Sequence, residues 1–314
     1  MIVATAKHRL LNLLQSALLL AAMALIAWVS IAIVLGPGIG LLAALGAVIG
    51  LAFAPDLPSQ ILLSAYQARP LGRRDAPGLV AAVEGLARRA GLSHVPALYR
   101  IPSQLPNAFA LGSPAQSTLC VTDGALDLLD GRELVAVLAH EVSHIAHRDL
   151  WIMGLADVMS RLVSLASWLG QVLLLINLPL LLAGVAYVPW PVVLLLIFAP
   201  TLTWLAQLGL SRTREYDADR AAVELTGDPQ GLIRALGKLE RRTGWFWEEI
   251  LLPGRRIPEP SLLRTHPPTE RRIARLRELA ADTTGIVGAF PDDPLGPSVP
   301  AVAAPRFRRF GTYW

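Results

Sequence analysis

The chain has 314 residues and a mass of 33.8 kDa; 54% of its residues are hydrophobic, 17% are charged, and its mean hydropathy is +0.49. This composition excludes a disordered chain and argues against a simple soluble globule, so we predict a membrane protein with soluble parts. The 28 Lys and Arg against 24 Asp and Glu leave a net charge of +4, too weak and scattered to indicate nucleic-acid binding.

The N-terminal part contains two uncharged stretches. Residues 10–35 carry no charge, and about 20 helical residues are enough to cross a bilayer. A Gly-Pro-Gly sequence at residues 36–38 predicts a turn, and a second uncharged stretch follows over residues 38–55. We therefore predict a transmembrane hairpin over residues 1–55. A cleaved signal peptide is the alternative, but the first stretch is too long for one and another span follows at once.

Residues 56–149 are predicted to form the first part of a soluble domain. A helix is expected to open at Asp75 and to stop at Gly91. Short apolar segments bounded by Pro, Gly and Ser predict strands at residues 96–101, 108–111 and 117–121. A helix from Arg132 to Arg148, capped by Asp130, follows them. Cys120, the single cysteine, lies within the third strand and is interpreted as a buried core residue.

The segment His140-Glu141-Val142-Ser143-His144 lies inside the last of these helices. Residues four apart share a helix face, so the imidazoles of His140 and His144 can meet at one metal ion. Glu141 is displaced by about 100° around the helix and lies beside the ion, where it can take a proton from water polarised by zinc. With only 6 histidines in the chain, a chance match is disfavoured. The motif predicts a zinc hydrolase.

Two histidines leave the metal short of a ligand, because catalytic zinc usually has three protein ligands and one open position. Spacing alone does not choose the third ligand. His147 lies three residues after His144, but it is too distant along a straight helix to share the ion easily. By residue type, the available side chains are Asp123, His147, Asp149, Glu215, Asp217, Asp219 and Glu224.

A longer uncharged stretch follows over residues 162–211. Pro and Gly in its middle predict a turn between two spans. Residues 150–211 are therefore predicted to form a second transmembrane hairpin. Lysines and arginines flank the outer ends of the stretches but are missing from both hairpin turns, around residues 36–40 and 177–191. The distribution places both termini and both soluble segments in the cytosol.

Residues 212–282 are predicted to form the second part of the soluble domain, because neither soluble segment looks complete by itself. Charged and capped patterns predict helices over residues 213–225, 228–242 and 269–281. The tail over residues 283–314 is rich in Gly, Pro and Ala, and we expect it to be loosely ordered.

The order of these motifs resembles the M48 peptidases, specifically the bacterial HtpX-type membrane-bound zinc metalloproteases. The resemblance covers about residues 1 to 280. It implies a mainly α fold with a small β-sheet: four transmembrane helices in two hairpins plus a split zincin-like cytosolic metalloprotease domain. The motifs that carry it are Asn107-Ala108-Phe109-Ala110, the zinc motif, Arg214-Glu215-Tyr216-Asp217-Ala218-Asp219 and Thr265-His266-Pro267-Pro268, placed around the two hairpins.

For the metal site, the resemblance implies one Zn²⁺ per subunit, held by His140, His144 and Glu215. Glu141 is the general base of the implied mechanism. Asp219 matches the family's conserved acid, which can accept the second N–H of a ligand histidine. A solvated, charged helix face is the alternative interpretation of Glu215 and Asp219.

For the substrate, the resemblance implies an active-site edge strand that begins with Asn107, Ala108 and Phe109 and binds an extended peptide by backbone pairing. His266 matches a donor to the tetrahedral oxyanion, and Arg272 matches the arginine that follows it. An ordinary turn residue for Asn107, and a surface or capping role for His266 and Arg272, are the alternatives.

The implied function is a zinc endopeptidase of the cell inner membrane, in which the lipid bilayer and polypeptide substrates are the partners. The substrates would be misfolded or damaged membrane proteins, as part of protein quality control. One alternative is a CAAX-type prenyl-protein protease, against which four spans instead of seven speak. Another is a catalytically silent membrane scaffold, against which the intact Glu141 speaks.

Overall fold

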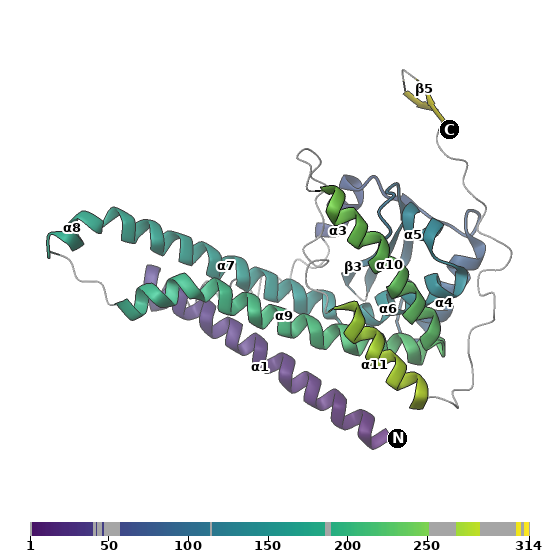
Figure 1. The fold of residues 1–314 in the computed structure, drawn as a ribbon, viewed down its shortest axis with the longest axis horizontal. Coiled ribbons are helices and arrows are strands. Elements are labelled where there is room, and N and C mark those ends of the chain that lie inside the picture. The colour runs from purple at the N-terminus through teal and green to yellow at the C-terminus, as the bar shows by residue number, and fades with distance from the viewer. Residues whose placement is uncertain are drawn as a thin grey trace.

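An elongated helical bundle carries, at one end, a part that contains a β-sheet (Figure 1). The bundle consists of α1 (Ile2–Leu35), α7 (Asp149–Ile176) and α9 (Trp190–Thr226), with the short α8 (Leu178–Leu182) at its far end. The structure is a computed structural model that describes residues 2–39, 42, 46, 57–113, 115–185, 190–250, 268–282, 306–308 and 311–313.

Three helices of the described ranges are long and apolar enough to cross a membrane. These segments are Leu14–Leu35, Asp149–Ile176 and Pro191–Thr226. Their large apolar side chains point outward, as at Leu18 and Leu165, which are 71% and 60% exposed. A surface of this kind is costly in water and is satisfied by lipid. The predicted second span, over residues 38–55, lies outside the described residues except for a few positions at its start.

Inside the bundle, α7 and α9 are joined by a hydrogen bond that follows from a proline. Pro200 lies within α9 and has no N–H, so the carbonyl of Leu196 loses its helical partner. The buried hydroxyl of Ser167 on α7 donates to that carbonyl. Because an unpaired polar group is costly in a bilayer, this bond fixes the two helices against each other.

The soluble part contains a four-stranded sheet with the order β1-β2-β4-β3. Strand β4 pairs in parallel with β2 and antiparallel with β3, where Phe109 lies opposite Cys120. Strand β3 is therefore at the edge of the sheet. The three predicted strands are confirmed, and β1 was not predicted. The strands are β1 (Arg69–Pro70), β2 (Ala97–Ile101), β3 (Ala108–Ser113) and β4 (Gln116–Thr122).

The helices predicted to begin near residues 75, 132, 228 and 269 are present, and α3 and α5 were not predicted. Helix α6 begins with a capping box, in which Asp130 accepts from the N–H of Glu133 and Glu133 accepts from the N–H of Asp130. Asp75 does not cap α4, because Ala76 is the N-cap and the Asp75 carboxylate accepts from Gly72. The helices are α3 (Leu57–Ala65), α4 (Pro77–Arg89), α5 (Asp123–Leu128), α6 (Gly131–Ala146), α10 (Pro229–Ile250) and α11 (Thr269–Asp282).

The prediction of a separate helix over residues 213–225 was wrong, because this stretch is the end of α9. Residues 203–226 contain no proline, and the change from apolar to charged side chains does not by itself end a helix. The helix therefore leaves the apolar bundle and enters the soluble part without a turn. Helix α10 is also longer than predicted. In the tail, β5 (Arg306–Arg308) and β6 (Gly311–Tyr313) form an antiparallel pair that was not predicted.

One hydrophobic core joins the two soluble segments. Leu86, Leu119 and Leu138 come from the segment before the second apolar stretch, and Leu232 and Leu276 come from the segment after it. All five side chains are buried in the same cluster. Packing of α6 between the sheet and α9 within this core brings the histidine motif next to the end of the bundle helix.

Candidate metal centre

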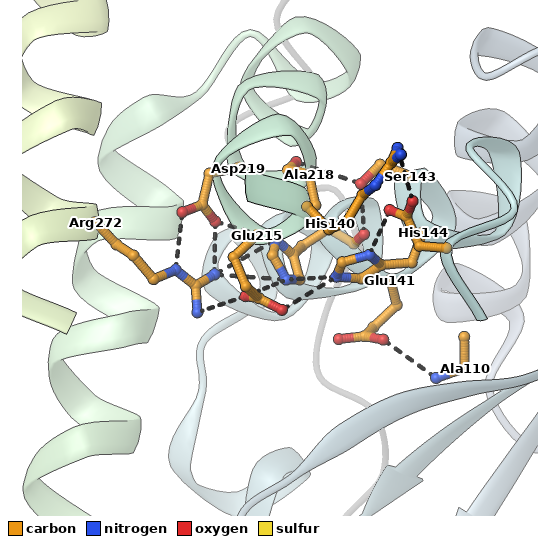
Figure 2. Close-up of polar contacts among 11 residues, drawn as sticks. Ala110, His140, Glu141, Ser143, His144, Glu215, Ala218, Asp219 and Arg272 are labelled. Atoms are coloured by element: carbon orange, nitrogen blue, oxygen red, sulfur yellow. Dashed lines mark hydrogen bonds and ion pairs between the residues drawn. The ribbon is translucent and has the colours of Figure 1, made fainter. Parts of the chain in front are cut away.

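Helices α6 and α9 bring His140, His144 and Glu215 together (Figure 2). The histidines lie one turn apart on α6, and the glutamate comes from the part of α9 that enters the soluble part. Their ligand atoms all lie within 4.8 Å of one another, and each of the three side chains is largely buried. The structure thus selects Glu215 from the acidic side chains that the sequence left open.

The distances within this cluster fit a tetrahedral metal ion. His140 Nε2 lies 3.1 Å from His144 Nε2 and 3.4 Å from Glu215 Oε2, and His144 Nε2 lies 3.6 Å from Glu215 Oε1. Ligands at about 2.0–2.1 Å from a tetrahedral ion are separated by about 3.3 Å. Two imidazole nitrogens and a carboxylate oxygen are also a donor set that zinc accepts. The residues present therefore fit a divalent ion.

Glu141 lies beside the three residues and contacts the edge strand. Its Oε2 accepts a hydrogen bond of 3.1 Å from the backbone N–H of Ala110 in β3. Figure 2 shows this carboxylate on the β3 side of the histidine pair. The predicted base is thus held between the candidate metal site and the outer edge of the sheet, and it is only half-buried.

The far side of His140 is held by Asp219 and Arg272. Nδ1 of His140 lies 3.1 Å from Asp219 Oδ1, and the Arg272 guanidinium donates to both Asp219 oxygens at 2.6 and 2.8 Å. Arg272, on α11, also lies 3.1 Å from Glu215 Oε2. Burial lowers the pKa of His140, but Asp219 and Glu215 outweigh burial and raise that pKa above its ordinary value. Both predicted neighbours of the site are therefore in place.

His144 has a corresponding pair, which sequence reasoning missed. Its Nδ1 lies 2.9 Å from Oδ2 of Asp149, and Oδ1 of Asp149 lies 3.3 Å from the guanidinium of Arg214. Asp149 was one of the candidates for the third ligand, but the structure places it behind the histidine. Burial lowers the pKa of His144, whereas Asp149 and Glu215 raise it well above its ordinary value.

The signal for Asp149 was its position directly after the helix that bears the motif. Arg148 has φ of 57° and ψ of 31°, a left-handed conformation that residues other than glycine rarely adopt. The chain changes direction there, so α7 begins at Asp149 and its side chain turns back toward His144. A sequence pattern does not show which residue takes this conformation.

The predicted substrate residues lie at the start of the edge strand. Asn107 immediately precedes β3, and its N–H donates to the hydroxyl of Thr122 at 2.8 Å. Ala108 and Phe109 belong to β3, and the Phe109 ring contacts Tyr66 edge-on, with 5.9 Å between centroids. His266, the predicted oxyanion donor, lies outside the described residues.

Other candidate side chains take no part in the metal cluster. His147 is the C-cap of α6, and Asp123 forms an ion pair with Arg100. Cys120 is fully buried, and its burial raises the pKa of its thiol to about 12. The interpretation of Cys120 as a core residue is confirmed.

Comparison with known proteins agrees with this geometry. Residues 74–280 match the profile of Peptidase family M48. A protease HtpX homolog from Acidiphilium cryptum is 37% identical over 293 residues, which cover 86% of this chain and 97% of that protein. Protease HtpX homologs from Thermococcus sibiricus and Aquifex aeolicus are 36% and 37% identical and match 70% of this chain, with 80% and 78% of their own lengths covered.

Among solved structures, S. mikatae Ste24p superposes with a TM-score of 0.49 at 19% identity, covering 86% of this chain and 67% of that one. The family profile spans most of the soluble part together with the apolar helices α7 and α9, and the relative from Acidiphilium cryptum covers 86% of the chain. The chain therefore belongs to Peptidase family M48, as a membrane-bound metalloprotease of the HtpX type.

Proposed function

We propose that this metalloprotease is a zinc endopeptidase that holds one Zn²⁺ per subunit between His140, His144 and Glu215. The observation that carries the proposal is the set of three buried side chains: the two Nε2 atoms lie 3.1 Å apart, and the Glu215 carboxylate oxygens lie 3.4 Å from His140 and 3.6 Å from His144. Nδ1 of each histidine is turned to a carboxylate, so both Nε2 atoms direct their lone pairs to one point. A cation bound at that point would stabilise this arrangement. When bound, the ion supplies a Lewis acid for the scissile carbonyl and lowers the pKa of water.

Glu141 is the general base in this proposal. Its carboxylate accepts the proton of the attacking water and then delivers it to the leaving amine. The hydrogen bond from Ala110 supports this role, because it holds the carboxylate beside the histidines and off the ligand set. Asp219 and Arg272 orient His140 by the contacts described above.

An extended peptide is proposed to pair with the outer edge of β3. Neighbouring residues of a strand turn their N–H groups to opposite sides, and the N–H of Ala110 points away from β4, toward Glu141. A peptide that adds to this edge, along Asn107, Ala108 and Phe109, would run past the candidate metal site. His266 is proposed as a donor to the developing oxyanion.

We also propose four spans in two hairpins. The proposed domain boundaries are, in chain order, a hairpin over residues 1–55, the first catalytic segment over 56–149, a second hairpin over 150–211, the second catalytic segment over 212–282 and a tail over 283–314. Basic residues at the outer ends of the spans support a cytosolic site and cytosolic termini in the inner membrane. Misfolded or damaged membrane proteins are the proposed substrates, since a site on the same helix as a bilayer span acts close to the membrane surface.

The experiment compares hydrolysis of an unstructured peptide and zinc content in wild type, Glu141→Gln and Glu215→Ala. We expect Glu141→Gln to retain zinc and to lose activity by about 10²- to 10⁴-fold, because only proton transfer is removed. Glu215→Ala should lose both zinc and activity. Glu224→Gln, at an exposed residue of the same helix, is the control and should change neither. Equal activity in wild type and Glu141→Gln would contradict the mechanism, and an inactive wild type would favour the scaffold.

A further inference from the structure

Each candidate zinc histidine is backed by its own carboxylate and arginine. His140 faces Asp219, which is held by Arg272, and the family resemblance already assigns that pair. His144 faces Asp149, which is held by Arg214. Nothing in the sequence motif or in the resemblance assigns a role to this second pair.

The second pair is buried and its geometry is specific. Asp149 is 2% exposed and Arg214 is 6% exposed, so neither charge is solvated. The two carboxylate oxygens of Asp149 are divided between two partners: Oδ2 faces His144 Nδ1 at 2.9 Å, and Oδ1 faces Arg214 at 3.3 Å. Buried charged groups are stable where they are paired, and Asp149 lies between the two groups that pair with it.

A carboxylate placed at Nδ1 determines which nitrogen of His144 is available to a metal. It accepts the Nδ1 proton, and Nε2 is then left with its lone pair toward His140 and Glu215. Arg214 keeps the carboxylate turned to the histidine and prevents Asp149 from competing as a ligand. Arg214 also directly precedes Glu215 on α9. The same turn of helix therefore supplies a proposed zinc ligand, Glu215, and the arginine that holds Asp149 against His144.

We propose that Asp149 and Arg214 are positioning residues for the zinc ligand His144, which join the first turn of α7 and the end of α9 to the metal site. This inference rests on the proposed zinc site. Asp149 is the first residue of α7, and Arg214 lies within α9. The ligand geometry is therefore fixed at the junction of two helices that continue into the apolar bundle.

The test uses full-length protein in detergent, freed of metal and titrated with Zn²⁺ against a competing chelator. Co²⁺ substitution adds a visible absorption spectrum that reports the geometry of the ligands. Removing a hydrogen-bond partner of a metal-bound histidine costs about 10- to 100-fold in affinity. We therefore expect Asp149→Asn to bind Zn²⁺ about 10- to 100-fold more weakly and to change the Co²⁺ spectrum.

A double variant and a matched control accompany Asp149→Asn. Removal of one partner leaves the other charge buried and destabilises the fold, so Asp149→Asn/Arg214→Met removes both charges and should show the same losses in folded protein. Asp157→Asn breaks an exposed ion pair with Arg161 on the same helix, at 2.8 Å, and should change neither affinity nor spectrum.

Two outcomes separate this inference from the function on which it rests. A folded double variant that binds Zn²⁺ within about twofold of wild type, with an unchanged Co²⁺ spectrum, overturns the positioning role and leaves the zinc endopeptidase standing. A wild-type protein that binds no Zn²⁺ overturns the proposed function itself.

Discussion

At the residue scale, the site is a set of buried charges of opposite sign that lie in contact with one another or with the two histidines. Asp149, Arg214, Glu215, Asp219 and Arg272 are each at most 6% exposed, and all of them contact one another or the two histidines. Isolated charges would be very costly at this depth. Loss of Asp149 would remove the carboxylate that pairs with Arg214, whereas Arg272 would keep one carboxylate after loss of either Asp219 or Glu215.

Stabilisation by zinc should depend on pH. The pKa values of His140 and His144 in the metal-free protein lie above the ordinary 6.5, because their carboxylate partners outweigh the effect of burial. A raised pKa stabilises the metal-free fold below the ordinary value, and this contribution is lost as pH rises through the raised pKa. Zinc requires neutral imidazoles. The increase in Tm on adding zinc should therefore grow as pH rises from about 6.5 through the raised pKa values of the two histidines.

The control for this pH dependence is Glu215→Ala, which should show a small zinc effect at every pH. An increase in Tm that stays constant or shrinks as pH rises would contradict the assignment of the two histidines as ligands.

Local spacing predicts only part of the site. His140, Glu141 and His144 form one turn of one helix, so the helical repeat alone places them. Glu215 is separated from them by a whole pair of apolar segments, and only the family resemblance selected it. Asp149 could not be predicted, because its position depends on the left-handed conformation of Arg148.

At the element scale, β3 has two partners, one on each side. Strand β4 takes up its inner hydrogen bonds, and the N–H of Ala110 on the outer side reaches Glu141. Turn residues at both ends of each strand made the strands predictable, but the sheet order was not. Neither was the continuity of α9, since a change from apolar to charged composition resembles a boundary.

Ala110→Pro should reduce kcat/KM without releasing the metal. Proline removes an N–H that points away from β4, so the ladder of the sheet is retained, but Glu141 loses its donor and the edge loses part of its register. A hydrogen bond to a charged group contributes about 1.5–3 kcal/mol, which corresponds to about 10- to 150-fold in kcat/KM. Ala110→Ser, which keeps the N–H, is the control. Wild-type kcat/KM in the proline variant would exclude a role for this edge.

Ser167→Ala should loosen the contact between α7 and α9. The variant leaves the Leu196 carbonyl without a partner, because Pro200 cannot supply one, and hydrogen bonds between membrane helices contribute about 1 kcal/mol. The measurement is unfolding in detergent. Ser164→Ala removes a hydroxyl on the same helix that bonds only to its own turn, at Ser160, and should have little effect. Equal stability of both variants would show that the bond does not hold the helices.

At the scale of the whole molecule, the composition of the chain indicated the general organisation of apolar and soluble parts. The uncharged stretches correctly predicted that helices apolar enough for a bilayer would alternate with soluble segments. The single core to which both soluble segments contribute agrees with the expectation that they pack together. The sequence could not show that the bundle and the soluble part share a helix.

The proposed orientation predicts the location of fused reporters. A reporter after Leu182, in the turn of the second hairpin, should be active outside the cytosol, and one after Ala281 should be active inside it, because basic residues flank the opposite ends of the spans. An alkaline phosphatase and a fluorescent-protein reporter at each position provide complementary signals. Activity of both fusions on one side would contradict the topology.

The continuity of α9 connects the candidate metal site mechanically to the bilayer. Its 37 residues form a rod of about 55 Å, with lipid around one end and Glu215 near the other. Helices adapt to thicker or thinner bilayers by tilting. His140 and His144 lie on α6, which packs against α9. We therefore expect a change in acyl-chain length to reach the glutamate and the two imidazoles through the contact between these two helices.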